Sequence, residues 1–234
     1  MLTIKVCCIG SVEEAHAALE AGATALGLVS AMPSGPGVID EARIAEIVAA
    51  VPVGTRTFLL TSAATVEAVV AQQRRARATT LQLVDALPPG AHAALRAALP
   101  GVELVQVVHV GGPAALAEAD ALADAARAGR GPDALLLDSG NPALAVKELG
   151  GTGRRHDWTV SRAIVERVAP LPVYLAGGLH AGNAAEAVRT VRPFGLDVCS
   201  GVRTDGRLDP ARAAAFVAAA RTAWIDPTPP DTAS

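Results

Sequence analysis

Two kinds of side chain in this sequence could exchange protons with a substrate, and each stands at the end of a short apolar run. Cys7 and Cys8 end the run LTIKVCC, and Asp138 ends the run PDALLLD. Partial burial raises the pKa of a carboxyl group and suits it to donating a proton. A nearby positive charge lowers the pKa of a thiol, and Lys5 is two positions before Cys7. We therefore predict Cys7 as a general base and Asp138 as a general acid.

Both residues also have a purely structural interpretation. A single cysteine in an apolar strand is usually a packing residue. Asp138 could instead form a turn by hydrogen bonding to the backbone of Gly140 or Asn141. Neighbouring strand residues point to opposite sides, so Cys7 and Cys8 are not both expected to face a ligand. The catalytic interpretation is preferred because the chain also carries a candidate anion site.

Three glycine-bearing turns follow the last three apolar runs. Glycine lets backbone N–H groups approach an anion closely, and the start of a helix can complete such a site. The alternative, turns that only relieve crowding, leaves the threonine of GGTG unexplained. We predict a phosphate site formed by Gly151, Thr152 and Gly153 in LGGTGRRHDW, Gly177 and Gly178 in LAGGL, and Ser200 and Gly201 in CSGV.

The order of apolar runs predicts the fold that positions these residues. Short, nearly all-apolar runs alternate with longer Ala-rich runs whose apolar residues recur every three or four positions. Eight such units predict an α/β protein, a single-domain (β/α)8 TIM barrel over residues 1–224 with a polar, Pro-rich tail over 225–234. An open doubly wound sheet is the alternative. The expected strands are 2–8, 23–30, 53–61, 79–85, 102–110, 132–138, 172–178 and 195–201.

A barrel places its site at the carboxyl ends of its strands, and this restricts the candidates further. The polar, cysteine and glycine residues at those ends are Cys7, Cys8, Ser30, Thr61, Asp85, His109, Asp138, Gly177, Gly178, Ser200 and Gly201.

Composition excludes several classes of protein. Hydrophobic residues make up 51% of the chain and aromatic residues 3%, so the expected core consists of Ala, Val and Leu. The net charge is −3 and the charges are scattered, which argues against nucleic-acid or membrane partners. The opening MLTIKVCCIG is too short for a signal peptide, and no apolar run approaches the roughly 20 residues of a membrane helix. Three cysteines without zinc-type spacing argue against a disulfide framework and a metal site. We expect a cytoplasmic monomer or homodimer.

These segments together resemble the phosphoribosylanthranilate isomerase family over nearly the whole chain. KVCCIG resembles the family's K-[IV]-C-G-[IL] opening, and LQLVD resembles its fourth strand. LGGTGRRHDW, PVYLAGGLHAGNAAEAV and GLDVCSGVRTDGRLDP resemble its last three units, in order. The combination of GGTG-x-x-x-DW, LAGGL and DV-x-SGV is specific to that family.

The resemblance implies an enzyme of tryptophan biosynthesis that needs no cofactor. The family's reaction is an Amadori rearrangement, in which an N-(5-phosphoribosyl)amine opens its furanose ring and becomes a 1-amino-1-deoxyribulose 5-phosphate. The resemblance implies that Cys7 takes the proton from ribose C2 and that Asp138 protonates the ring oxygen. The glycine turns would hold the phosphate of this small phosphosugar substrate.

The loop AMPSGPGVID departs from the family pattern. The family usually carries S-P-R-x-V here, with an arginine that pairs with the anthranilate carboxylate, and Gly37 stands in its place. Val84 replaces a family histidine, and Cys8 replaces a family glycine and is expected to pack outward. Further candidate substrate-binding residues are Lys5, Gln82, Arg56 and His109, of which Arg56 or His109 could supply the missing charge.

Two other functions stay open at this point. One is an isomerase of the same type that acts on another phosphosugar amine, whose aglycone lacks the carboxylate. The other is a barrel that binds a sugar phosphate without catalysis, although such a protein would not need an acid and a base.

Overall fold

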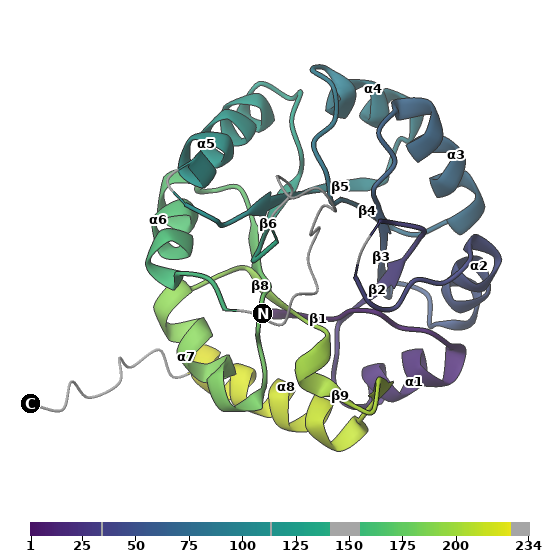
Figure 1. The fold of residues 1–234 in the computed structure, drawn as a ribbon, viewed down its shortest axis with the longest axis vertical. Helices are drawn as coiled ribbons and strands as arrows, with labels where there is room; N and C mark the ends of the chain where they lie inside the picture. Colours follow the sequence, from purple (N-terminus) through teal and green to yellow (C-terminus); the bar gives the residue numbers. More distant parts are fainter. Residues whose placement is uncertain (34, 113, 141–154, 226–234) are drawn as a thin grey trace, which may run out of the picture.

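Eight parallel strands close into one barrel, surrounded by helices, in the computed structural model (Figure 1). The model describes residues 1–33, 35–112, 114–140 and 155–225. The strands are β1 (Thr3–Val6), β2 (Ala25–Val29), β3 (Arg56–Thr61), β4 (Thr80–Leu83), β5 (Glu103–His109), β6 (Ala134–Asp138), β7 (Val173–Leu175) and β8 (Gly195–Val198). Each strand pairs with the next in the chain, and β1 pairs with β8. The predicted barrel is therefore confirmed, and the open sheet is excluded.

A helix follows each barrel strand within the described residues. Polar side chains fix several helix starts, because the side chains of Ser11, Asp40 and Thr65 accept hydrogen bonds from backbone N–H groups in the first turn. The helices are α1 (Val12–Glu20), α2 (Glu41–Ala50), α3 (Val66–Ala76), α4 (Ala91–Ala98), α5 (Ala114–Arg127), α6 (Trp158–Val168), α7 (Ala181–Val191) and α8 (Pro210–Ile225). Most of the expected tail, residues 226–234, lies outside the described residues.

A small antiparallel hairpin between β8 and α8 was not predicted. Its strands are β9 (Arg203–Thr204) and β10 (Arg207–Leu208), preceded by the 3-10 turn η1 (Ser200–Val202). Asp205 and Gly206 form the turn with φ values of +49° and +77°. An Asp-Gly pair is a strong hairpin signal, so the segment TDGR could have predicted this hairpin.

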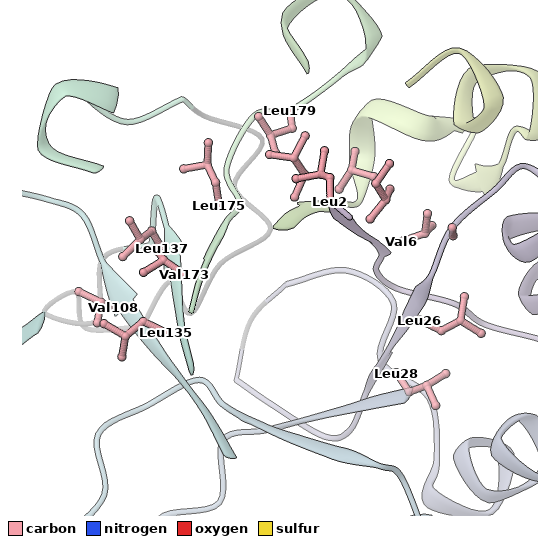
Figure 2. Close-up of a cluster of buried hydrophobic side chains, with 14 of the residues drawn as sticks. Leu2, Val6, Leu26, Leu28, Val108, Leu135, Leu137, Val173, Leu175 and Leu179 are labelled. Carbon is pink, nitrogen blue, oxygen red and sulfur yellow. The ribbon is translucent and has the colours of Figure 1, made fainter. Parts of the chain in front are cut away.

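The barrel strands divide the core into two apolar clusters, because successive side chains point to opposite faces. Ile4, Val6, Leu26 and Leu28 belong to the cluster that also holds residues of the surrounding helices. Figure 2 shows part of it, with Val6, Leu26 and Leu28 on β1 and β2. A second cluster contains Cys7, Val29, Phe58, Leu60, Val105, Val107, Leu136 and Tyr174. The alternation directs Lys5 and Cys7 to the opposite face from Ile4 and Val6, toward the lumen of the barrel.

Of the helices that the structure describes, none is both long and apolar enough to cross a membrane.

Candidate active site

Lys5 forms the centre of a buried polar cluster inside the barrel. Its Nζ atom lies 2.7 Å from Asp197 Oδ2, 2.8 Å from Gln82 Oε1 and 3.7 Å from Cys7 Sγ. The Lys5 side chain is 0% exposed and that of Asp197 is 8% exposed. Burial alone would lower the pKa of Lys5, but the negative charge of Asp197, followed by that of Cys7, raises it above its usual value. Lys5 therefore carries its positive charge beside the Cys7 thiol, as the spacing in the sequence indicated.

Cys7 lies just beyond the end of β1, where its position is fixed by its neighbours. Its backbone N–H donates to the carbonyl of Val198 on β8 at 2.8 Å. A Cβ atom placed on Gly27 of β2 would lie 2.7 Å from Cys7 Sγ, so only glycine leaves room for the thiol. Sequence reasoning did not single out Gly27, and it also missed Asp197. Asp197 was detectable by the rule that identified Asp138, because a carboxylate within an apolar strand needs an explanation.

Asp138 ends β6 at the same end of the barrel. Its side chain is buried, and its Oδ1 atom accepts a hydrogen bond from the backbone N–H of Ser139 at 2.7 Å. Burial raises the pKa of Asp138, the hydrogen bond from Ser139 opposes that shift, and the negative charge of Asp197 adds to it. The turn-forming alternative named Gly140 or Asn141 as the partner, whereas the described hydrogen bond comes from Ser139, and Asn141 lies outside the described residues. A carboxyl group with a raised pKa is also suited to donating a proton.

His109 ends β5 and is the register partner of Asp138 on β6. Its Nε2 atom lies 3.1 Å from the carbonyl oxygen of Val84. A carbonyl only accepts hydrogen bonds, so Nε2 is the donor in this contact. His109 also lines a cavity of about 720 Å³ with Asp85, Glu118 of α5 and other residues. Burial raises the pKa of Glu118, and the positive charge that His109 can carry opposes this shift.

Two of the three predicted glycine turns lie against each other. Gly177 and Gly178 follow β7 with φ values of +87° and +63°, which only glycine adopts without strain. A Cβ atom on Gly201 would lie 2.0 Å from the carbonyl oxygen of Leu179, so the turn after β8 packs directly on the turn after β7. The third turn, with Gly151, Thr152 and Gly153, lies outside the described residues. Ser200 is exposed and begins the 3-10 turn η1.

Comparison with known proteins identifies the family. The family model described as N-(5'phosphoribosyl)anthranilate (PRA) isomerase matches residues 4–219. The chain belongs to this family. N-(5'-phosphoribosyl)anthranilate isomerase from Halobacterium salinarum is 38% identical over 230 residues, which cover 97% of this chain and 99% of that protein.

Solved structures of the same family share the fold. The structure of TrpF from Jonesia denitrificans has a TM-score of 0.74 at 29% identity and covers 97% of this chain and 100% of that one. N-(5'-phosphoribosyl)anthranilate isomerase from Pyrococcus furiosus has a TM-score of 0.74 at 26% identity, over 95% of this chain and 100% of that one.

Arg56 does not belong to the candidate site. It is the first residue of β3, so it lies at the amino end of the barrel, opposite to Asp138 at the end of β6. It forms an ion pair with Glu103, the first residue of β5. Our expectation for Arg56 is therefore corrected, because the residue lies near the wrong end of its strand. Lys5, Gln82 and His109 lie inside the barrel or at its carboxyl end.

Cys8 does not pack outward, as the rule of alternating strand residues led us to expect. β1 ends at Val6, and Cys8 has a left-handed φ of +63°, so the alternation no longer applies. Its Sγ atom lies 2.6 Å from Cys199 Sγ, just after β8. A Cβ atom on Gly37 would lie 2.4 Å from Cys8 Cβ. Cys8 therefore occupies the space that a side chain at position 37 would need.

No group of three or more His, Cys, Asp or Glu side chains that could hold a metal ion is present in residues 1–33, 35–112, 114–140 and 155–225.

Proposed function

We propose that this protein catalyses the Amadori rearrangement of an N-(5-phosphoribosyl)amine, and that N-(5'-phosphoribosyl)anthranilate is its substrate. The observation that carries the proposal is the placement of Cys7, with the Lys5 charge 3.7 Å from its thiol, and of Asp138, with a raised pKa, at the same end of the barrel. A barrel that only bound a sugar phosphate would need neither group.

The reaction divides between the two groups. Asp138 starts protonated and gives its proton to the ring oxygen as the bond from this oxygen to C1 breaks, which leaves an iminium ion at C1. Cys7 is the general base, with the Lys5 charge 3.7 Å from its sulfur, and takes the proton from C2. The resulting enolamine becomes the ketone as C1 gains a proton and the C2 hydroxyl loses one. The proton on Cys7 then returns to Asp138 through solvent, which restores both groups. The substrate supplies all the atoms and electrons, so the scheme requires no cofactor.

The phosphate is the natural anchor for this substrate. Gly177, Gly178, Ser200 and Gly201 offer backbone N–H groups at the turns after β7 and β8, and we propose Gly151, Thr152 and Gly153 as further phosphate ligands. The tight contact of Gly201 with Leu179 supports one joint site formed by the two described turns.

A second substrate class is favoured by one specific observation. The Cβ and Sγ atoms of Cys8 fill the space beside Gly37, where the family resemblance led us to expect an arginine for the anthranilate carboxylate. An amine without this carboxylate would not need that arginine. On β5, His109 reaches Val84 at the position of the family histidine, so it could supply a polar contact to the aglycone.

The test compares two substrates that differ only in the carboxylate. The fluorescence of freshly prepared phosphoribosylanthranilate is followed after adding the protein, with Asp138→Asn as the control variant. The adduct of aniline and ribose 5-phosphate is assayed in parallel by chromatography. Turnover of the anthranilate substrate, lost in the variant, supports the proposal, and turnover of the aniline adduct alone supports the second class. Binding of ribulose 5-phosphate without turnover of either substrate would leave only a sugar-phosphate-binding barrel.

We also propose a cytoplasmic location and a monomer or homodimer as the assembly. The three free cysteines and the biosynthetic family support the location. Size-exclusion chromatography with light scattering decides the assembly.

A further inference from the structure

Two thiols outside the proposed acid–base pair meet at the carboxyl end of the barrel. Cys8 follows β1 and Cys199 follows β8, two strands that pair directly. Their Sγ atoms lie 2.6 Å apart, although the residues are separated by 191 positions in the sequence. A disulfide joins its sulfur atoms at about 2.03–2.05 Å, so about half an ångström separates this pair from bonding distance.

The Arg203 side chain fixes the backbone that carries Cys8. Arg203 donates from Nη2 to the carbonyl oxygen of Cys7 at 3.2 Å and also to that of Cys8. Its Nη1 atom forms an ion pair with Glu14 at 3.1 Å, and the Arg203 side chain is only 11% exposed. The guanidinium therefore fixes the peptide that presents Cys8 and places a positive charge beside the two thiols.

The two thiols differ in reactivity and access. The hydrogen bond with Cys8 lowers the pKa of Cys199, burial opposes this shift, and the charge of Arg203 adds to it. The same hydrogen bond, followed by one with Cys7 and by burial, raises the pKa of Cys8. Cys199 is partly exposed, whereas Cys8 is buried. Cys199 is therefore the more acidic and the more accessible of the two thiols, and the one that an oxidant reaches first.

We propose that Cys8 and Cys199 are a redox-active pair, which a peroxide converts into an intramolecular disulfide while Cys7 stays unoxidised. The Cys199 thiolate attacks one peroxide oxygen, the O–O bond breaks, and the released hydroxide takes a proton and leaves as water. Cys8 Sγ then attacks the sulfur of the sulfenic acid on Cys199, and the sulfenic oxygen leaves with the thiol proton as a second water. The two thiols lose two electrons and two protons, and one peroxide is reduced to two waters.

Cys7 differs from this pair in its surroundings. Its thiol lies beside Lys5 and Gly27 in the lumen, and a disulfide between neighbouring residues would be strained. The proposal does not depend on the substrate or on any isomerase activity, since it is read out on the thiols themselves.

The test counts thiols after oxidation with one equivalent of hydrogen peroxide, by alkylation under denaturing conditions and intact mass. Cys7 and Cys8 are neighbours and share most proteolytic peptides, so a Cys7→Ala variant makes the mapping unambiguous. We expect oxidised Cys7→Ala to lose both remaining alkylatable thiols, with a peptide cross-linked between positions 8 and 199. The matched variants Cys8→Ala and Cys199→Ala should form no intramolecular disulfide.

Two results would overturn the proposal. In one, the oxidised Cys7→Ala variant keeps both thiols although its circular dichroism matches that of the wild type. In the other, Cys8→Ala forms a disulfide as fast as the wild type, which would assign the bond to Cys7 and Cys199.

Discussion

Replacing Gly37 by arginine tests whether Cys8 excludes a carboxylate-binding side chain from this position. Gly37 has a φ of +78°, and a Cβ atom there would lie 2.4 Å from Cys8 Cβ. Left-handed backbone costs a residue other than glycine roughly 1–2 kcal/mol. Forcing additional atoms into a packed site typically costs about 1–3 kcal/mol. We expect Gly37→Arg to lower the free energy of unfolding by about 2–5 kcal/mol, the sum of these terms.

Removing the side chain at position 8 should restore only the steric part of this loss. Cys8→Gly removes the Cβ and Sγ atoms that meet position 37, and glycine adopts the φ of +63° found at Cys8 without strain. The double variant should therefore be more stable than Gly37→Arg by about 1–3 kcal/mol. Urea unfolding of the wild type, both single variants and the double variant completes a double-mutant cycle and gives the coupling between the two positions.

The same four proteins also test whether an arginine at position 37 recognises the carboxylate of the anthranilate substrate. A hydrogen bond between charged groups contributes roughly 1.5–3 kcal/mol, which corresponds to about 10- to 150-fold in kcat/KM. We expect the preference for phosphoribosylanthranilate over the aniline adduct to rise by this factor in the double variant and to stay unchanged in Cys8→Gly.

Two outcomes would refute this reasoning. If Gly37→Arg alone is as stable as the wild type and gains the preference, Cys8 does not exclude the side chain. If the double variant folds but gains no preference, position 37 does not face the aglycone carboxylate.

Three further predictions concern the acid, the buried lysine and the phosphate turns. Asp138→Asn should lower kcat by orders of magnitude while the Kd for ribulose 5-phosphate, measured by calorimetry, stays within a few-fold. Burial raises the pKa of Asp138, so ionisation of this carboxyl group destabilises the fold as pH rises through that pKa. The Asp138→Asn variant should therefore be more stable than the wild type at pH 7 but not below the usual aspartate pKa, as measured by urea unfolding. Lys5→Met leaves the Asp197 charge buried without its partner and should lower the free energy of unfolding by about 3–5 kcal/mol. Adding Asp197→Leu should restore most of this loss. Equal stabilities of the single and double variants would contradict the pairing. Gly201→Ala should weaken binding of ribulose 5-phosphate at least about tenfold, because its methyl group would meet the carbonyl of Leu179, and unchanged binding in a folded variant would remove this turn from the phosphate site.

The fold and the positions of Cys7 and Asp138 at strand ends could be predicted because each depends on a local pattern repeated along the chain. The apolar strands place Cys7 and Asp138 at strand ends, and barrel closure brings the ends of β1 and β6 to the same face. Arg56 was placed wrongly because element boundaries are the least certain part of a sequence-based prediction. β3 begins at Arg56, so this residue lies at the amino end of the barrel, away from the candidate site.

Contacts between distant residues could not be predicted in this way. The interaction of Lys5 with Asp197 depends on the pairing of β1 with β8, because it joins residues separated by 192 positions. The orientation of Cys8 depends on a left-handed φ that a non-glycine residue rarely adopts, and the one signal for it was the family glycine that Cys8 replaces. Its contact with Gly37 depends on how the loop after β2 returns to β1.

Cys8 takes part both in the proposed exclusion of a side chain at position 37 and in the proposed disulfide. Its Cβ atom excludes a side chain at Gly37, and its Sγ atom lies beside Cys199. A disulfide would hold Cys8 Sγ in a position where a Cβ atom on residue 37 would lie 3.1 Å from it. A larger residue at position 37 should therefore hinder formation of the disulfide. Peroxide should therefore form the disulfide more slowly in Gly37→Ala than in the wild type, measured by thiol alkylation over time. Equal rates in the two proteins would show that the Cys8 thiol moves independently of the loop.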